Sequence, residues 1–508
     1  MATSSKTSSK LQKQKLWLLL IMSVGVALLC MYAEIVASKF IQPVGRDVHA
    51  QGSSERTSVG RTNWAKVLIL GAGAAGMSAA KELTQNGITD FLMIEGSNRI
   101  GGRLKSVRFG GKTVEAGANW MMVRNARNPL WQTIQKYNIS GRTLDEKDVL
   151  IRYMNGEDVT TTAGAKAWEK LSIAKETMSE ITTRMTSGAQ SDMSIRACLG
   201  LGEWEPVTAV ENVAEVFEYD FQYGNTPEVS SCRSDGILQQ YLDGMYYIAD
   251  EKGFESVIKN VADEIFEQND ERLILNEVVH TINYTDSNVV VETSSSTIYI
   301  SEFVLLTFSI GVLKSGSVIF NPSLPEWKVD NLARVRFENY MSIFLKFPDN
   351  TRQFWDDALY ILHAHERRNF YPVWINHNSD AMSTEDTNIL QLVTFGEEAD
   401  RISKMDDAEI TKEVMEVLRK VYCKGNVSEP EDVLITRWKT DPLYQGSFAN
   451  VQPGIPLESL GTISAPVGRL HFAGDAYSEF DGYVVGAAIS GVESARRILQ
   501  TLRDGANS

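Results

Sequence analysis

A glycine-rich turn between an apolar run and a helix-like stretch constrains the fold of this chain more than any other feature. The run Lys66–Leu70 has the character of a buried strand, and the six residues after it read GAGAAG, a G-x-G-x-x-G pattern. In such a turn, Gly71 allows the tight bend, Gly73 lets the backbone approach a pyrophosphate, and Gly76 lets helix and strand pack closely. Unpaired N–H groups at the start of the helix, around Ala75, favour phosphate. These residues therefore predict a βαβ unit that binds a dinucleotide.

An acidic residue at the end of the next strand extends this pattern. The apolar run Phe91–Ile94 ends at Glu95, about 20 residues beyond the glycines, where an acid accepts hydrogen bonds from ribose hydroxyls. A carboxylate there repels a 2′-phosphate, so the pattern disfavours NADP and leaves FAD and NAD open. Gly102 and Arg103 follow in an RIGGR run and suit a second pyrophosphate contact, in which the guanidinium neutralises phosphate. A solvated surface cation is the alternative for Arg103.

The composition is that of an acidic globular chain with more than one domain. At 508 residues it exceeds what one compact core supports, so two domains are expected. The formal net charge of −15 argues against a nucleic-acid partner, and an acidic surface either attracts cationic substrates or keeps the protein soluble. None of the four cysteines forms a C-x-x-C pair, so the sequence does not support a zinc or dithiol site. Cys198, Cys232 and Cys423 could form one disulfide, and the sequence leaves the pairing open.

The N-terminal segment is expected to lie outside the fold. The uncharged stretch Leu16–Ala33 follows several lysines and would span about 27 Å as a helix, close to the ~30 Å of a bilayer core. With basic residues on its N-terminal side, a single-pass membrane anchor would leave the catalytic part lumenal or extracellular. A cleaved signal peptide is the alternative and would give a secreted protein. The glycosylation acceptors Asn138, Asn283 and Asn426 are consistent with either route.

Near the C-terminus, a short strand-like run is followed by a glycine, an acid and a helix of small residues. Phe472 and Ala473 precede Gly474 and Asp475, and the helix begins close to Val484. Asp475 could accept a hydrogen bond from a ribityl or phosphate-side hydroxyl, and the start of the helix could stabilise negative charge on a cofactor. A helix that packs tightly on a sheet would need the same small residues.

Taken together, these motifs resemble those of the flavin-containing amine oxidase family, and most closely the plant-type polyamine oxidases. The resemblance extends from about Lys66 to about Leu499 and rests on several separated motifs in family order. Besides the turn, Glu95 and the RIGGR run, they are EAGANW at 115–120, GVLK at 311–314, PSLPEWK at 322–328, RW at 437–438 and FAGD at 472–475.

The resemblance implies an α/β fold with FAD as the cofactor. Its parts would be a Rossmann-like FAD-binding domain assembled from separated segments, and an α+β substrate domain with a mixed sheet and a helical insertion. The expected ranges are 62–124, 254–316 and 432–505 for the FAD-binding domain, and 125–253 and 317–431 for the substrate-binding domain. Residues 1–61 would form a cytoplasmic tail, an anchor or signal segment and a stem.

The resemblance also implies oxidation of an amine. A hydride equivalent would pass to the flavin from the carbon beside the nitrogen, water would hydrolyse the imine, and molecular oxygen would reoxidise the flavin and give hydrogen peroxide. The cofactor-binding residues that it implies are Gly71, Gly73, Ala75, Gly76, Glu95, Gly102, Arg103, Ala118, Asn119, Trp120, Val279, Trp438, Gly474, Asp475 and Val484. Tyr340, Ser342 and Tyr483 occupy catalytic positions, and Met122, Gln222 and Tyr223 occupy substrate-binding positions. The aromatic residues among them could instead pack in the core.

Three pocket positions depart from the family pattern. Where the family usually has a lysine that holds a water at flavin N5, this chain has Ser342, and Lys346 lies roughly 13 Å further along the same strand, too far to replace it. Met122 and Gln222 stand where related polyamine oxidases have glutamates that hold the polycation. A buried ammonium without a counter-charge is costly, so the substrate is either a polyamine held differently or a less charged amine. A membrane-tethered flavoprotein with weak or lost oxidase activity is the alternative, and an NAD-dependent dehydrogenase is a third.

Overall fold

The computed structural model describes residues 62–383, 387–423, 426–455 and 457–506, which belong to a compact unit, Gly60–Ser508. The expected anchor or signal segment at residues 16–33 lies outside the described residues. Among the helices within these ranges, none is both long enough and apolar enough to cross a bilayer.

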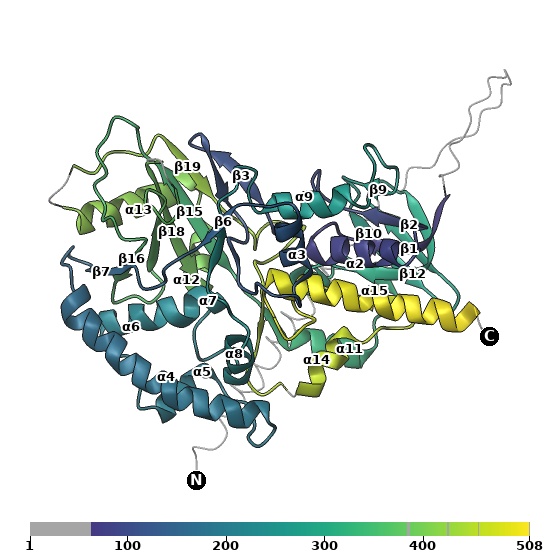
Figure 1. Cartoon of the computed structure of the whole chain (residues 1–508), viewed down its shortest axis with the longest axis horizontal. Helices are drawn as coiled ribbons and strands as arrows, with labels where there is room; N and C mark the ends of the chain where they lie inside the picture. The colour runs from purple at the N-terminus through teal and green to yellow at the C-terminus, as the bar shows by residue number, and fades with distance from the viewer. Residues whose placement is uncertain (1–61, 384–386, 424–425, 456, 507–508) are drawn as a thin grey trace, which may run out of the picture. The chain divides into compact units, whose positions relative to one another are not determined.

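In the described part of the chain, eight strands form one sheet around the glycine turn (Figure 1). β1 (Thr62–Leu70) runs parallel to β2 (Phe91–Ile94) on one side and to β12 (Ile298–Leu306) on the other. The first residues of β12 also pair with β11, and its last residues pair with β21. The other strands are β9 (Leu273–Ile274), β10 (Val279–Tyr284), β11 (Val289–Thr293), β13 (Ile319–Asn321) and β21 (Leu470–Phe472). The second half of β1 is buried on both faces, which explains its continuous apolar run.

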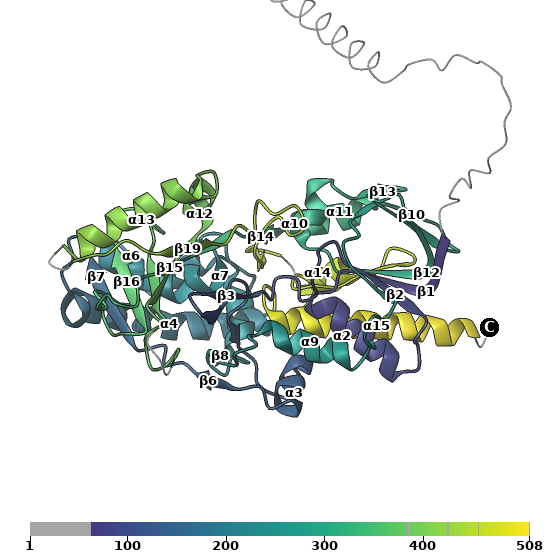
Figure 2. The ribbon, with the colours of Figure 1, turned by 90° about the horizontal axis from the view of Figure 1, so that it is seen from above.

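Two helices pack against each other beside this sheet. α2 (Ala74–Gln85) begins at the glycine turn, α15 (Val484–Ala506) follows the C-terminal motif, and the two lie side by side in both views (Figures 1 and 2). A Cβ at Gly491 of α15 would lie 2.1 Å from the carbonyl oxygen of Ala75, so only glycine permits this approach. The small residues near the C-terminus therefore serve helix packing, while Val484 at the start of α15 reaches the cavity described below.

A second sheet contains six of the described strands. In spatial order they are β19 (Asp432–Ile435), β15 (Tyr340–Lys346), β18 (Ile389–Phe395), β17 (Val373–Asn376), β16 (Tyr360–Ala364) and β7 (Val149–Tyr153). The pairs are antiparallel except β16 with β7. α13 (Asp407–Val421) covers one face and packs on Ile343 and Leu345, whereas α4 (Ala165–Thr186) belongs to the core on the other face, with Tyr360 and Val373 (Figure 2). Because both faces are covered, nearly all of β15 is buried.

Shorter elements complete the described chain. The other helices are α3 (Pro129–Lys136), the π-helix η1 (Thr160–Gly164), α5 (Ile195–Leu201), α6 (Ala209–Glu215), the π-helix η2 (Val216–Asp220), α7 (Phe221–Tyr223), α8 (Cys232–Gln239), α9 (Glu255–Asp263), α10 (Ile310–Ser315), α11 (Glu326–Ala333), α12 (Gly396–Ile402) and α14 (Leu457–Ser464). The strands outside the two large sheets are β3 (Ser106–Phe109), β4 (Lys112–Glu115), β5 (Trp120–Met121), β6 (Gly141–Thr143), β8 (Tyr246–Ile248), β14 (Val335–Phe337) and β20 (Ala449–Val451). The expected helical insertion is present as α4, α5 and α6.

This architecture is the expected α/β fold, with one sheet around the glycine turn and a second, mixed sheet. The expected domain ranges stay a prediction. Two strands lie in the range that was expected for one domain but pair with the sheet of the other. β13 begins after residue 316 and belongs to the eight-stranded sheet, because it pairs with β10. β19 begins at residue 432 and belongs to the six-stranded sheet, because it pairs with β15.

A disulfide joins Cys198 of α5 to Cys232, the first residue of α8. This bond answers the question of pairing that the sequence left open, and it fixes the start of α8 to the helical insertion. Cys423 is exposed and carries a free thiol.

Candidate active site

A cavity of about 480 Å³ extends from the glycine turn to the aromatic side chains of β15 and of the loop before α15. With the exception of Gly76, every residue that the sequence indicated for the site lines it. They are Gly71, Gly73, Ala75, Glu95, Gly102, Arg103, Ala118, Asn119, Trp120, Met122, Gln222, Tyr223, Val279, Tyr340, Ser342, Trp438, Gly474, Asp475, Tyr483 and Val484. The structure thus brings these residues together, and their individual roles stay predictions.

Glycines shape one end of the cavity. Gly71 has a φ of +112°, and a Cβ there would lie 2.3 Å from Oγ1 of Thr307. A Cβ at Gly76 would lie 2.0 Å from the carbonyl oxygen of Gly71, which is why this glycine lies under the turn rather than in the cavity wall. At Gly73, by contrast, the nearest contact of a Cβ among the described residues would be the Cα of Gly102, at 3.9 Å. Gly73 therefore leaves open space that a ligand could fill with a close approach to the backbone.

The carboxylate of Glu95 is held at the end of β2 by backbone donors. Its Oε2 accepts from the N–H of Ala72 at 2.8 Å, and its Oε1 accepts from the N–H of Ser97 at 2.9 Å. Each carboxylate oxygen can accept more than one hydrogen bond, and the residue lines the cavity. Glu95 can therefore accept hydrogen bonds from the hydroxyls of a ribose.

Arg103 and Asp475, which were expected to contact the cofactor separately, bind each other. The guanidinium donates from NH1 to Oδ2 at 2.9 Å and from NH2 to Oδ1 at 2.7 Å. Asp475 also accepts from the N–H of Ala449 at 2.8 Å. Burial would raise the pKa of Asp475, but Arg103 outweighs it and holds that pKa below its usual range. Arg103 is thus not a solvated surface cation, because its guanidinium is paired within the chain; its contact with a pyrophosphate stays a prediction.

Aromatic side chains form the other end of the cavity. Nε1 of Trp120 and the hydroxyls of Tyr340 and Tyr483 are buried and have no hydrogen-bond partner among the described residues. Trp438 differs from them, since its Nε1 donates to the carbonyl of Ala116 at 3.0 Å. Buried polar groups are normally satisfied, so three unpartnered donors in one cavity indicate that a ligand completes them.

Ser342 is held by a chain of hydrogen bonds that runs away from the cavity. Nε2 of Gln391 donates to Oγ of Ser342 at 2.9 Å, and Oε1 of Gln391 accepts from Nε2 of His377 at 3.0 Å. Burial lowers the pKa of His377 to about 4, so at pH 7 its neutral ring donates its single N–H here. Ser342 Oγ therefore acts as an acceptor toward Gln391 and keeps its own proton for an acceptor in the cavity.

Lys346 does not replace the missing lysine. It lies on the same strand as Ser342, but its Nζ donates to the carbonyl of Phe347 at 2.8 Å and pairs with Asp349. It does not line the cavity. Strand spacing predicted that Lys346 is too far along β15 to act in place of Ser342, and its position agrees with that prediction.

The substrate-binding positions are linked to an acid outside the cavity wall. Nε2 of Gln222 lies 3.4 Å from the hydroxyl of Tyr223, and this hydroxyl donates to Oδ1 of Asp235 at 2.6 Å. Met122 lines the same cavity and carries no charge. A carboxylate thus lies one hydrogen bond behind the wall, although both glutamate positions are neutral.

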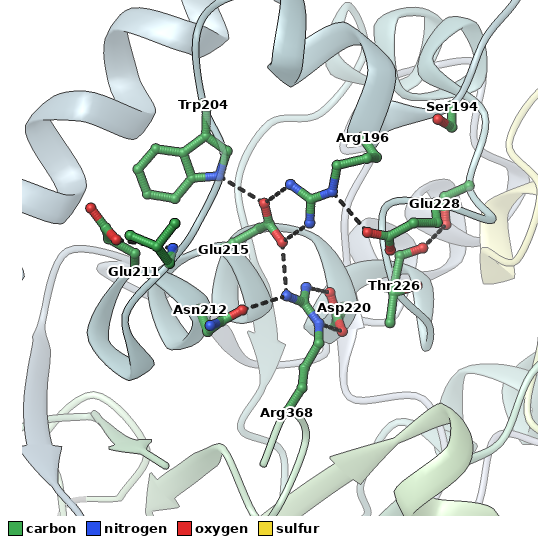
Figure 3. Close-up of polar contacts among 12 residues, drawn as sticks. Ser194, Arg196, Trp204, Glu211, Asn212, Glu215, Asp220, Thr226, Glu228 and Arg368 are labelled. Carbon is green, nitrogen blue, oxygen red and sulfur yellow. Dashed lines mark hydrogen bonds and ion pairs between the residues drawn. The ribbon is translucent and has the colours of Figure 1, made fainter. Parts of the chain in front are cut away.

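A buried group of charges fixes the segment that carries Gln222 and Tyr223 (Figure 3). Glu215 accepts from Nε1 of Trp204 at 2.7 Å and from NH1 of Arg196 at 2.6 Å. Arg368 joins Glu215 at 2.8 Å to Asp220 at 2.6 Å. Because Asp220 immediately precedes α7, this network holds the start of the cavity wall in place.

Several residues of the site were not anticipated from the sequence. Phe221, Phe448, Thr436 and Asp481 line the cavity, and Gln391 contacts it through Ser342. Gln391 had a detectable signal, since it is the amide side chain within the otherwise apolar run that opens β18, residues 389–393. Phe448 had none, because a loop aromatic shows no pattern that separates it from core packing.

The cavity suits FAD and offers no metal centre. Open space at Gly73, the Glu95 carboxylate and unpartnered donors at the aromatic end match a dinucleotide with a polar ring system. Within the described ranges, no group of three or more His, Cys, Asp or Glu side chains could hold a metal ion. The fold and the cavity thus define a dinucleotide-binding flavoprotein.

Comparisons with known proteins give the family. The sequence model described as flavin containing amine oxidoreductase matches residues 74–499. Polyamine oxidase 1 of Zea mays is 32% identical over 468 residues, which is 88% of this chain and 92% of that protein. Polyamine oxidase 7 of Oryza sativa subsp. japonica is 32% identical over 85% of this chain and 94% of its own length. Wild-type putrescine oxidase bound to putrescine has the same fold, with a TM-score of 0.68 at 17% identity over 86% of this chain and all of that one.

The chain therefore belongs to the flavin-containing amine oxidoreductase family, and it is an FAD-dependent amine oxidase of the polyamine-oxidase-like kind.

Proposed function

We propose that this protein oxidises a small-molecule amine at the carbon beside the nitrogen, and that molecular oxygen is the electron acceptor. One observation carries the proposal: a single cavity joins the glycine-lined end, marked by Glu95, to a wall with three unpartnered donors. When bound, FAD would take a hydride equivalent from the amine, and its electrons would pass to oxygen as hydrogen peroxide. Water would then hydrolyse the imine.

The chain's own residues bind and orient the reactants. Glu95 accepts from ribose hydroxyls, and Gly73 allows the backbone to approach the pyrophosphate. Ser342 presents an oriented proton at the position where related enzymes have a lysine. Tyr340 and Tyr483 line the part of the cavity where an amine would meet the flavin, and their rings would exclude water from it.

The test uses purified protein that carries its flavin. We expect anaerobic spermidine or spermine to bleach the long-wavelength flavin absorbance, and air to restore it with one peroxide per turnover. Simple monoamines serve as the comparison substrates. Bound FAD that no amine reduces would contradict amine oxidation.

The second candidate is a flavoprotein with weak or lost oxidase activity, and Ser342 favours it because the usual lysine is absent. Flavin reduction by amines without reoxidation by air would indicate a dehydrogenase. The absence of any reduction would favour a binding module.

We also propose a route through the secretory pathway, with residues 16–33 as a membrane anchor and the catalytic part lumenal or extracellular, or with cleavage and secretion. The Cys198–Cys232 disulfide supports an oxidising compartment. The acceptors Asn138 and Asn426 are exposed, as glycosylation requires. Protease protection and glycosidase sensitivity of the protein in microsomes would test this, and a form that is cytosolic, unglycosylated and reduced would contradict it.

A further inference from the structure

At the substrate end of the cavity, two buried carboxylates have no cation. Glu215, Asp220 and Asp475 are buried, and each of them pairs with an arginine. Asp235 and Asp481 are buried as well, but neither forms an ion pair with a described residue. Both accept hydrogen bonds from neutral donors instead. A buried carboxylate without a cation is costly, so a group from outside the chain could complete it.

Both acids depend on the same short helix. Ser234 of α8 donates from Oγ to Oδ1 of Asp481 at 2.6 Å, and the next residue, Asp235, accepts from the hydroxyl of Tyr223. The N–H of Val451 is the second donor to Asp481, at 3.2 Å. Since the disulfide holds Cys232 at the first turn of α8, the positions of both acids are fixed relative to the helical insertion.

The two acids reach the cavity in different ways. Asp481 is itself part of the cavity wall, next to Gly482 and Tyr483. Asp235 lies behind the wall, and its charge acts through the Tyr223 hydroxyl, whose proton it accepts at 2.6 Å. The oxygen of Tyr223 remains an acceptor: it receives only a long hydrogen bond from Nε2 of Gln222, at 3.4 Å, and a charged donor in the cavity could bind it more strongly.

Other features of the same wall also suit a cation. The Tyr483 hydroxyl is buried without a partner among the described residues. The aromatic residues Phe221, Tyr223 and Phe448 also line the cavity, and aromatic rings attract ammonium groups. Burial raises the pKa of Asp481 to about 6 and raises that of Asp235, as uncompensated negative charge requires.

We propose that Asp481 and the Tyr223–Asp235 pair bind an ammonium group of the substrate remote from the reacting nitrogen, and so make the cavity selective for diamines and polyamines over monoamines. These residues supply the counter-charge that Met122 and Gln222 do not. The inference rests on the proposed function, and it identifies which residues decide the substrate class.

Two probes of equal length test it, hexane-1,6-diamine and hexylamine, which differ by one ammonium group. Binding is measured by calorimetry on dithionite-reduced holoenzyme, which cannot oxidise either amine. We expect the wild type to bind the diamine at least about tenfold more tightly, as a charge-assisted hydrogen bond allows. We expect Asp481→Asn and Asp235→Asn each to remove most of this preference and to change hexylamine binding less than about threefold.

Asp243→Asn is the charge-matched control, because Asp243 is an exposed carboxylate that accepts from the N–H of Arg124. It should keep the preference. The flavin spectrum and Tm show whether each variant is folded, and if neither aspartate variant folds, the wild-type comparison decides. A wild type without preference, or folded Asn variants that keep it, would overturn the inference. Failure of the proposed function is recognised separately, because oxidised wild-type flavin would then not be reduced by any amine.

Discussion

The two ends of the cavity differ in what fixes their geometry. At the cofactor end, the backbone supplies most of the constraints, beside the one charged pair Arg103–Asp475 described above. Gly71 and Gly76 have no room for a Cβ, and two N–H groups hold Glu95. At the substrate end, side chains from distant segments hold one another, as Gln391 holds Ser342 and Ser234 holds Asp481. Backbone constraints admit few residue types, whereas side-chain contacts can be rebuilt with others. This difference explains why the cofactor end keeps the family motifs while the substrate end departs from them.

The largest expected effect tests the charged pair at the cofactor end. Arg103→Met would leave Asp475 buried without its cation, so we expect a loss of about 3–5 kcal/mol in the free energy of unfolding and loss of bound flavin. Denaturant unfolding and flavin content measure both. The double variant with Asp475→Asn should recover part of the stability. A single variant that loses less than about 1 kcal/mol would show that the pair is not what holds this end together.

The next effect concerns the glycine turn. Gly76→Ala places a methyl group 2.0 Å from a backbone oxygen, so we expect about 1–3 kcal/mol of destabilisation or more. Gly200→Ala is the matched control, because a Cβ there meets nothing within 4 Å and the residue lies in α5. That control should be neutral or stabilising by up to about 1 kcal/mol. Equal melting temperatures for the two variants would contradict the claim that the backbone at Gly76 has no room for a Cβ.

At the substrate end, a smaller loss is expected from Ser342→Ala. The change leaves Nε2 of Gln391 buried without an acceptor, which costs about 1–2 kcal/mol. Gln391→Leu alone also costs stability, because it leaves the buried Nε2–H of His377 without an acceptor. The double variant should nevertheless lose less than the sum of the two single losses, because it lacks the Gln391 donor that Ser342→Ala leaves unpaired. A double-mutant cycle by thermal unfolding measures the coupling. Zero coupling would mean that Ser342 is not held by Gln391.

The smallest effect per pH unit is a dependence of stability on pH from Lys328, which contacts Phe472 of β21 and Ala465 after α14. Its Nζ donates to the carbonyl of Ala465 at 2.8 Å over the ring of Phe472, and burial lowers its pKa to about 7. Between pH 7 and 10 the unfolded chain binds a proton that the folded chain lacks, so this group makes stability rise with pH, by at most about 1.4 kcal/mol per unit. Lys328→Met should flatten the rise relative to the wild type. Parallel curves for the two proteins would contradict the assignment.

The difference between the two ends of the cavity also decided what could be predicted from the sequence. The βαβ unit and Glu95 were predictable because glycine spacing and strand order report backbone geometry directly. The pairing of Arg103 with Asp475 was not, since residues 372 positions apart reveal no contact in one sequence. The role proposed for Asp235 and Asp481 could not be predicted for a related reason. A sequence does not show whether an aspartate is buried without a cation beside it. The sequence did identify Ser342 as a departure, but not the Gln391–His377 chain that holds it.

The most direct measurement is the absorbance spectrum of the purified protein before and after anaerobic addition of spermidine. We expect a flavin spectrum from bound FAD that the amine bleaches and air restores. A protein without flavin that also fails to take it up, or a flavin that no amine bleaches, would contradict this expectation.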